Sequence, residues 1–177
     1  MIARIAYATG AIPEITYGIH ESLFGHCAIG IVKGRVAALA FIAGKGDRVA
    51  RAAIRATWPE AALVRDDAGT AAYAKKAFSG KSVSLLVRGT DFQIRVWHAL
   101  LAIPAGKVAT YAAVAAAAGS PGASRAVGSA CARNGIAYLI PCHRVIAGNG
   151  SLGGYRWGAA LKERLLAWEA AKGQSLT

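Results

Sequence analysis

Apolar and polar residues alternate in three short stretches of the N-terminal part of the chain. The stretches are residues 15–20, 27–32 and 36–42. Alternation with a period of two is typical of β-strands that bury one face. Glycines and charged residues separate the stretches, as they do at turns. The pattern therefore predicts an antiparallel meander of three strands.

Helical spacing follows the third stretch. Residues 47–58 have the spacing of a helix that stops at Pro59, and residues 70–78 predict a second, short helix. Residues 83–87 predict one more strand. Turn sequences on both sides of this strand indicate a domain boundary near residue 88.

Beyond this boundary the pattern is helical. Residues 92–101 and 111–118 predict two helices. The pair Ser120-Pro121 predicts the start of a third helix that runs to about Arg133, with serine as the N-cap and proline in the first turn. Two short helices joined by a tight turn that contains glycine suggest a helix-turn-helix.

The last of these helices has two different faces. Val127, Ala130 and Cys131 share one face and suit a core. Small residues on the other face would let the helix backbone approach another surface closely, and arginines could bind phosphates. This composition favours contact with nucleic acid over a solvated face, for which Glu and Lys would be typical. The residues of the second face are Gly122, Arg125, Ala126, Ser129 and Arg133.

The composition is that of a folded chain. Its 177 residues are 55% hydrophobic, which is enough apolar material for a core. We expect an α+β protein with two domains. Residues 1–88 would form a small antiparallel sheet domain with helices, and residues 89–177 a helical, winged-helix-like domain with a helix-turn-helix.

The formal net charge of +12 favours a polyanionic partner. No acidic residue lies between Asp91 and Glu163, so the basic residues of this stretch are unopposed. A carboxylate would repel a phosphate backbone, and the stretch therefore predicts a phosphate-facing surface, with a solvated basic face as the alternative. The basic residues are Arg95, Lys107, Arg125, Arg133, Arg144, Arg156 and Lys162.

Other features exclude several classes of protein. Three cysteines without a Cys-x-x-Cys pair do not indicate a disulfide framework or structural zinc, and His20, His26 and Cys27 are a weak metal candidate. No run of 18 apolar residues is present, and the first residues lack the apolar core of a secretory signal. We expect a cytoplasmic monomer with no metal, no cofactor and no membrane partner.

An apolar, strand-like run at residues 136–141 leads directly to Cys142 and His143. Taken alone, this neighbour pair is weak, because adjacent side chains on a strand point to opposite faces and buried cysteines are often inert. The pair by itself favours a structural role.

The longer string changes this interpretation. Pro-Cys-His-Arg-Val at residues 141–145, after Arg-Ala-Val-Gly at residues 125–128 and Asn134, closely resembles the O6-alkylguanine-DNA alkyltransferase family, also called methylated-DNA-protein-cysteine methyltransferases. The resemblance covers about residues 89–170, and the Tyr-Arg-Trp-Gly string is most like the C-terminal domain of the adaptive-response protein Ada. Further matching strings lie at residues 90–93, 103–106, 110–111, 153–158 and 165–169.

The resemblance implies direct-reversal DNA repair. Cys142 would accept an alkyl group irreversibly from O6-alkylguanine, and from O4-alkylthymine, in double-stranded DNA. His143 would act as a base through a water, Glu169 would orient the histidine, and Asn134 would connect the recognition helix to the site. Each molecule would act once, as a stoichiometric methyltransferase.

The resemblance also implies that the damaged nucleotide is rotated out of the duplex. Arg125 would fill the gap, and Tyr111 would crowd the phosphate and hydrogen-bond the guanine. The remaining implied residues line either the minor groove or the alkyl pocket, where Trp157 would sit on the rim and favour methyl over benzyl adducts. The groove residues are Ser124, Ala126, Gly128 and Ser129, and the pocket residues are Val145, Tyr155, Arg156 and Trp157.

The chain departs from the family pattern at three positions. Gly122 replaces a lysine of many members, and Gly135 and Ala137 replace prolines of some. Two other functions remain open: a lesion-binding protein without transfer chemistry, and a cysteine hydrolase or acyltransferase. The length leaves no room for the zinc and transcriptional modules of Ada, so we expect repair without transcriptional control unless the chain is a fragment.

Overall fold

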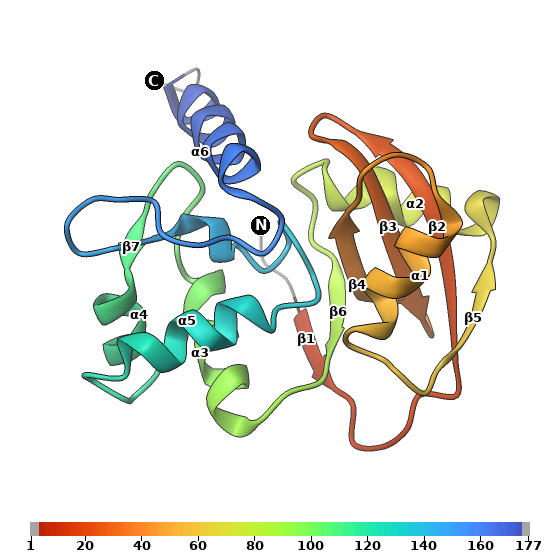
Figure 1. Cartoon of the computed structure of the whole chain (residues 1–177), viewed down its shortest axis with the longest axis horizontal. Coiled ribbons are helices and arrows are strands. Elements are labelled where there is room, and N and C mark those ends of the chain that lie inside the picture. The colour runs from red at the N-terminus through yellow and green to blue at the C-terminus, as the bar shows by residue number, and fades with distance from the viewer. Residues whose placement is uncertain (1–3, 175–177) are drawn as a thin grey trace. The chain divides into compact units, whose positions relative to one another are not determined.

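The computed structural model describes residues 4–174. The chain divides into two compact units (Figure 1). One unit contains the residues up to Arg88 together with Gly135–Leu139, and the other contains Gly89–Asn134 together with the residues from Ile140 onward. Helices and strands occur together, which confirms the α+β class.

The first unit is built on a six-stranded sheet with the order β1-β6-β4-β3-β2-β5. The neighbouring strands β2, β3 and β4 pair antiparallel and confirm the meander. β1 and β5 were not predicted, because each has four residues, lies at a sheet edge and shows no alternation; both pair in parallel with their neighbours. The strands are β1 (Arg4–Tyr7), β2 (Glu14–Ser22), β3 (Gly25–Val32), β4 (Arg35–Phe41), β5 (Ala62–Arg65) and β6 (Ser84–Val87).

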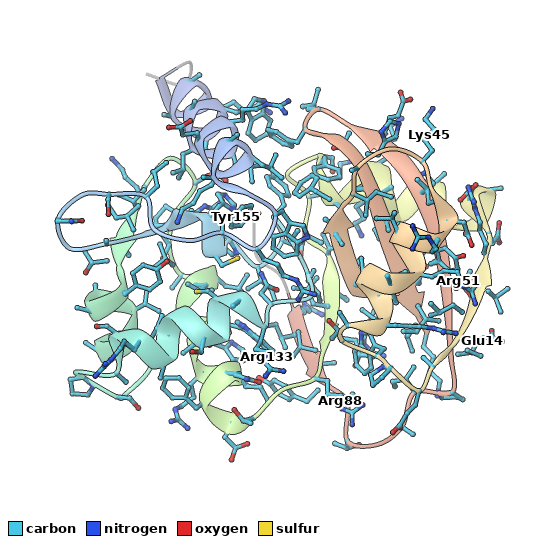
Figure 2. All side chains as sticks on the ribbon, viewed as in Figure 1. Glu14, Lys45, Arg51, Arg88, Arg133 and Tyr155 are labelled. Atoms are coloured by element: carbon cyan, nitrogen blue, oxygen red, sulfur yellow. The ribbon has the colours of Figure 1, made fainter. Side chains whose placement is uncertain are left out.

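Two helices accompany this sheet. α1 (Asp47–Arg55) is shorter than predicted, because the chain leaves the helix at Ala56 and buries Trp58, whose indole donates to the carbonyl of Ala37 at 2.9 Å. α2 (Asp67–Ala77) begins earlier than predicted, because the Asp66 carboxylate caps it by accepting from the Gly69 amide. On α1, the Arg51 guanidinium (Figure 2) donates to the Tyr17 hydroxyl and to the Leu63 carbonyl.

Gly135–Leu139 belongs to the first unit although it lies far beyond residue 88. Leu39 of β4 donates to the Gly135 carbonyl at 3.0 Å and accepts from the Ala137 amide at 2.7 Å, forming a parallel bridge at Ile136. The predicted strand-like run at 136–141 is therefore a single bridge. It ends at Tyr138, where φ is +64°. The division at residue 88 did not anticipate this segment because its partners are distant in sequence.

The two departures from proline in this segment have structural reasons. A Cβ on Gly135 would lie 2.4 Å from the Thr57 hydroxyl oxygen, so a side chain there would require Thr57 to move. Ala137 donates the amide hydrogen that proline lacks. Tyr138 then packs its ring against those of Phe24 and Phe78, at centroid distances of 5.9 and 5.1 Å.

The second unit is mainly helical. Helices α3 and α4 confirm the predictions for residues 92–101 and 111–118 to within a residue. The only sheet in the described part of this unit is a parallel pair of two-residue strands, so an antiparallel wing is not seen there. The elements are α3 (Asp91–Leu101), β7 (Ala109–Thr110), α4 (Tyr111–Ala117), α5 (Ser124–Ala132), the 3₁₀ turn η1 (Cys142–Arg144), β8 (Val145–Ile146) and α6 (Ala159–Gln174).

The predicted start of α5 at Ser120 was wrong. The Ser120 amide donates to the carbonyl of Ala115 at 2.9 Å after Gly119 takes φ of +72°, so this serine closes α4. Gly122, with φ of +86°, interrupts the helical path, and α5 begins at Ser124 without a side-chain cap. Among residues 4–174, no helix is both long and apolar enough to cross a membrane.

Candidate active site

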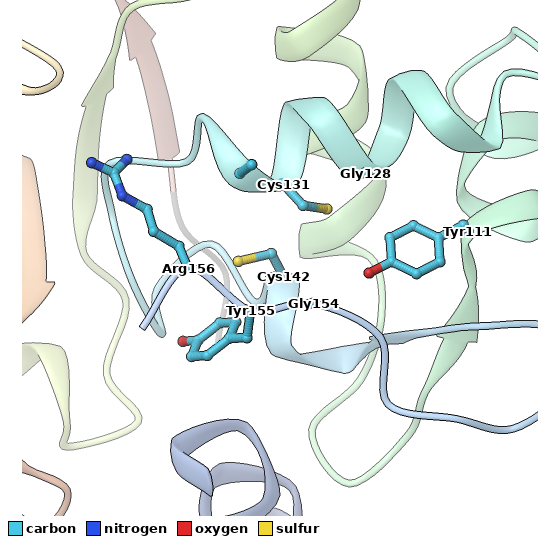
Figure 3. A pocket seen from close by; sticks show the side chains of 8 residues that line it. Tyr111, Gly128, Cys131, Cys142, Gly154, Tyr155 and Arg156 are labelled. Carbon is cyan, nitrogen blue, oxygen red and sulfur yellow. The ribbon is translucent and has the colours of Figure 1, made fainter. Parts of the chain in front are cut away.

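Cys142 lies on the wall of a pocket of about 380 Å³ in the second unit (Figure 3). Cys142 is only 3% exposed. α4 and α5 contribute to the lining, and so does the loop before α6. The lining residues are Tyr111, Gly128, Cys131, Ala132, Cys142, Gly154, Tyr155 and Arg156.

The backbone around Cys142 turns sharply. The Cys142 amide donates to the Ile140 carbonyl at 2.8 Å, and the Arg144 amide donates to the Pro141 carbonyl at 3.0 Å. Cys142 and His143 are therefore successive residues of a 3₁₀ turn. The opposite-face rule for neighbours on a strand does not apply to them.

Asn134 connects the end of α5 to the cysteine. Its side-chain amide donates to Cys142 Sγ at 3.2 Å and to the Ile140 carbonyl at 3.0 Å. Burial raises the pKa of the Cys142 thiol to about 11, although the hydrogen bond from Asn134 and the charge of Lys162 oppose this effect. The group is therefore a thiol at neutral pH, and it needs a base if it is to react as a thiolate.

A buried network of charges lies next to the cysteine. Glu169 of α6 is 2% exposed, and its Oε1 accepts from His143 Nε2 at 3.0 Å. Arg144 binds both carboxylate oxygens, with Nε 2.9 Å from Oε2 and one Nη 2.7 Å from Oε1. The Gly106 amide donates to Oε2 at 3.2 Å. The carboxylate is thus held from three sides.

This network sets the protonation of its members. Burial acts to raise the pKa of Glu169, but the hydrogen bonds from His143 and Arg144 outweigh it and lower the pKa to about 2. Burial lowers the pKa of His143, although Glu169 opposes this. A neutral histidine that donates through Nε2 has Nδ1 as its basic nitrogen. The arrangement can therefore accept one proton at His143.

Lys162 of α6 is fully buried (0% exposed). Its ammonium donates to the carbonyls of Val145 at 2.5 Å and Leu152, and more weakly to Gly154 at 3.4 Å. Burial lowers its pKa, while the two cysteines of the pocket act to raise it. Lys162 therefore attaches the loop that carries Gly154 to α6.

The comparisons with known proteins agree with this geometry. The family model described as 6-O-methylguanine DNA methyltransferase, DNA binding domain, matches residues 91–171. The chain is 53% identical over 89 residues to the bifunctional transcriptional activator and DNA repair enzyme Ada of Escherichia coli K12, which covers 50% of this chain and 25% of that protein. It is 51% identical over 90 residues to the methylated-DNA–protein-cysteine methyltransferase of Mycobacterium tuberculosis H37Rv, covering 51% of this chain and 54% of that protein.

A solved structure extends the similarity beyond this half. The crystal structure of Mycobacterium tuberculosis OGT in complex with DNA matches with a TM-score of 0.72 and 33% identity, over 89% of this chain and 94% of that chain. The chain belongs to the O6-alkylguanine-DNA alkyltransferase family. It spans between a quarter and about half of the length of these two curated relatives.

Several residues that the family resemblance singles out come together in this pocket. Tyr111, Gly128, Tyr155 and Arg156 line it with Cys142. Two others do not. Val145 is fully buried, and Trp157 lies outside the lining, with its ring 5.2 Å from that of Tyr155.

The faces of α5 are as predicted. Val127, Ala130 and Cys131 are buried. Ser124 and Gly128 are half-buried, and the rest of the predicted contact face is exposed. Its exposed members are Gly122, Arg125, Ala126, Ser129 and Arg133, the last of which is labelled in Figure 2.

The sequence did not reveal the burial of two basic residues or the presence of three residues in the pocket lining. Two of the basic residues predicted to face phosphate, Arg144 and Lys162, are buried, because each satisfies carboxylate or carbonyl oxygens inside the unit. Cys131, Ala132 and Gly154 line the pocket without having been named for it. The burial of Cys131 on α5 was the one available signal.

Proposed function

We propose that this protein repairs alkylated double-stranded DNA by transferring a methyl or other small alkyl group from O6-alkylguanine, and from O4-alkylthymine, to Cys142. The observation that carries the proposal is the position of Cys142. Its thiol lines a pocket, receives a hydrogen bond from Asn134, and is followed by a histidine bound to a buried carboxylate.

The transfer is a displacement at the alkyl carbon. Cys142 Sγ forms a bond to this carbon as the bond from the carbon to guanine O6 breaks, and the electron pair stays with the guanine. The thiol loses one proton and the guanine gains one, so the reaction is balanced. His143 would take up the thiol proton through a water, with Glu169 and Arg144 holding its ring. The thioether is not cleaved, and each molecule acts once.

A guanine in a base stack cannot reach a thiol that is 3% exposed. The proposal therefore includes rotation of the nucleotide out of the duplex. The exposed face of α5 suits the minor groove, because Ala126, Gly128 and Ser129 are small and Arg125 is exposed to enter the stack. Tyr111 lines the pocket beside this helix and would contact the flipped nucleotide.

The two units would divide the work. Residues 89–177 would form the helix-turn-helix DNA-binding and transfer domain, and residues 1–88 would form a supporting domain. We propose that the protein acts as a monomer. We place this activity in the cytoplasm, without a cofactor.

Two other functions use the same residues differently. A lesion-binding protein without chemistry would need the α5 face but no activated cysteine, whereas Cys142, His143 and Glu169 are all present here. A cysteine hydrolase or acyltransferase would need donors aimed at an oxyanion. The donors nearest the sulfur, from Asn134, are already bound to Sγ and to the Ile140 carbonyl.

The test is intact-protein mass spectrometry after incubation with a duplex oligonucleotide that contains one O6-methylguanine. We expect a mass gain of one methylene that saturates at one per molecule, with peptide mapping that places it on Cys142 and not on Cys27 or Cys131. The Cys142→Ala variant should bind the duplex and gain no mass.

Other results would select the other functions. Tight binding of the duplex by the wild type without a mass gain would indicate a lesion-binding protein. Repeated hydrolysis of a thioester substrate would indicate the hydrolase. If the protein neither binds the duplex nor gains mass, the similarity to the family is one of fold alone.

A further inference from the structure

The chain has only two asparagines, Asn134 and Asn149, and glycine follows each of them. The main-chain nitrogen of the next residue can attack the side-chain amide of an asparagine. Glycine leaves this nitrogen open to such an approach, because it has no side chain. The two Asn-Gly pairs share this chemistry, so their surroundings in the fold decide which of them can react.

The fold protects Asn134. This residue is 0% exposed, and its side-chain nitrogen donates to Cys142 Sγ at 3.2 Å and to the Ile140 carbonyl at 3.0 Å. Loss of this nitrogen as ammonia would break both hydrogen bonds inside the protein, and buried acceptors would lose their donor. Water would also have to enter. The pair at Asn134 is therefore held unreactive.

Asn149 lies in an exposed turn that follows β8. The Gly150 amide donates to the Ala147 carbonyl at 3.0 Å, and Gly150 has φ of +84°. A single backbone hydrogen bond in an exposed turn opens at low cost, which frees the Gly150 nitrogen. Within residues 4–174, the Asn149 side-chain nitrogen donates no hydrogen bond, in contrast to that of Asn134. The leaving group is therefore not held.

Ser151 binds the other atom of the Asn149 amide. Its main-chain amide donates to Asn149 Oδ1 at 3.1 Å, and its hydroxyl donates to the same oxygen at 2.8 Å. Two donors on one carbonyl oxygen make the carbonyl carbon more electrophilic, and they stabilise the negative charge that the oxygen gains when the carbon is attacked. The turn thus leaves the leaving group free and activates the carbon.

We propose that Asn149 is a site of spontaneous deamidation, and that the carboxylate formed there weakens the binding of the protein to DNA. The first part is independent of the proposed function, and the second part rests on it. No acidic residue lies between Asp91 and Glu163, so deamidation places the first carboxylate in this stretch. A carboxylate repels the phosphates that the unopposed basic residues of the stretch attract.

The reaction consumes one water and releases one ammonia. The Gly150 nitrogen loses its proton to solvent and forms a bond to Asn149 Cγ. The bond from Cγ to Nδ2 breaks, and ammonia leaves after taking up a proton from solvent, so that a five-membered succinimide remains. Water then adds to one of the two ring carbonyls and opens the ring, which yields aspartate or isoaspartate. No oxidant or cofactor is required.

The first experiment ages the folded protein in warm, mildly alkaline buffer and maps its tryptic peptides by mass spectrometry. Trypsin cleaves after Arg133, Arg144 and Arg156, so the two asparagines fall in separate peptides of one sample. We expect the peptide with Asn149 to gain about one dalton as the amide becomes an acid, while the peptide with Asn134 keeps its mass. Each sample thus contains its own control.

Three variants test the contacts of the turn. Gly150→Ala should slow the mass gain several-fold, because a methyl group crowds the attacking nitrogen. Ser151→Ala should also slow it, because Asn149 Oδ1 loses the hydroxyl donor. Asn149→Gln should abolish the gain in this peptide, since the longer side chain would have to close a larger ring. Ser151→Ala leaves the positive φ at Gly150 untouched, so it tests the proposal even if Gly150→Ala alters the turn.

The second experiment measures the binding of an undamaged duplex. Asn149→Asp should bind about threefold more weakly than the wild type, as expected for one exposed charge, and the difference should shrink as salt is added. Asn149→Gln should bind like the wild type, because it adds no charge. Ser79→Asp adds the same charge at an exposed position of the first unit, outside the basic stretch, and should weaken binding less.

Several outcomes would overturn the proposal. An unchanged mass at Asn149, or an equal gain at Asn134, would show that the surroundings described above do not control deamidation. Binding of Asn149→Asp that equals that of the wild type would remove the effect on DNA. If the wild type itself did not bind the duplex, the proposed function would be contradicted while the mass gain at Asn149 would stand, so the two failures can be distinguished.

Discussion

Lys162 carries an ammonium group into a site with no exposed surface. Its partners are backbone carbonyls, at Val145, Leu152 and Gly154, and none of them is charged. A buried charge without a counter-charge persists only where its hydrogen bonds are satisfied. The cost of burying this charge is offset by the hydrogen bonds of the ammonium to carbonyls of β8 and of the following loop.

We predict that Lys162→Met lowers the free energy of unfolding by about 3 kcal/mol, because buried carbonyls lose their donor. The pH at which alkyl transfer reaches half its maximal rate should rise, since the charge of Lys162 lowers the pKa of Cys142. Urea unfolding and transfer rates measured against pH check the two effects. The control is Lys107→Met, at an exposed lysine, which should change stability by less than about 0.5 kcal/mol.

If Lys162→Met leaves the pH profile in place and only lowers stability, the lysine acts on the loop alone. That result would remove it from any account of thiol activation.

At the scale of elements, two strings that match the family are helix caps. Thr90 and Gln93 form a capping box at the start of α3, with each side chain bound to the other residue's backbone amide. The Thr110 hydroxyl accepts from the Ala113 amide and begins α4, which places Tyr111 at the first position of that helix. These threonines therefore matter for where the helices start.

The loop before α6 contacts Tyr111 through a glycine. Gly153 has φ of +68°, and a Cβ there would lie 3.0 Å from the Tyr111 hydroxyl oxygen and 3.2 Å from its ring. On the side of α5, a Cβ at Gly128 would be 3.9 Å from the same ring. The absence of a side chain at Gly153 thus sets the position of Tyr111.

We predict that Gly153→Ala slows alkyl transfer about tenfold by displacing Tyr111, beyond a stability loss of about 1 kcal/mol from the positive φ. Gly150→Ala is the matched control, because Gly150 lies in the same loop with φ of +84° and a Cβ there would meet nothing within 4 Å. Single-turnover rates and thermal melting of both variants check this. Equal rates in the two variants would mean that strain, and not contact with Tyr111, is responsible.

At the scale of the whole molecule, Glu169 joins segments that are distant in sequence. It receives hydrogen bonds from the loop at Gly106 and from η1, through His143 and Arg144. The pKa of its carboxyl is about 2 in the folded protein, below its ordinary value of 4.5. The unfolded chain therefore binds this proton more readily than the folded one.

We predict that the free energy of unfolding falls by about 3 kcal/mol as the pH drops from about 4.5 to about 2, at 1.36 kcal/mol per pKa unit. His143 also lowers the stability of the folded protein as the pH falls. This effect begins near pH 6.5, because burial lowers the pKa of His143 from that value. Urea unfolding at a series of pH values checks the curve. Glu169→Gln should remove the lower part, while Glu163→Gln, at an exposed position of α6, should keep it.

If the free energy of unfolding of the wild type did not change with pH below 4.5, this prediction would be wrong. Retention of the full pH dependence in Glu169→Gln would assign it to other carboxylates.

The sequence by itself determined those features that depend on neighbouring residues. The meander, helices α3 and α4, and the buried face of α5 follow from local periodicity, and the string around Cys142 indicates the family. Where a local signal competed with another, the prediction was wrong: Ser120-Pro121 has the pattern of a helix start, yet Ser120 closes α4 through Ala115. The short edge strands β1 and β5 carry no periodic signal at all.

Only the tertiary structure decided which residues are buried with which partners. By composition, Arg144 and Lys162 would be expected at the surface. In the fold, Arg144 is buried against the Glu169 carboxylate, and Lys162 is buried against the Val145 carbonyl. Gly135–Leu139 joins the first unit because it pairs with Leu39 of β4. The cost of burying a charge or a backbone amide depends on what lies opposite it in space, and a linear pattern does not contain that information.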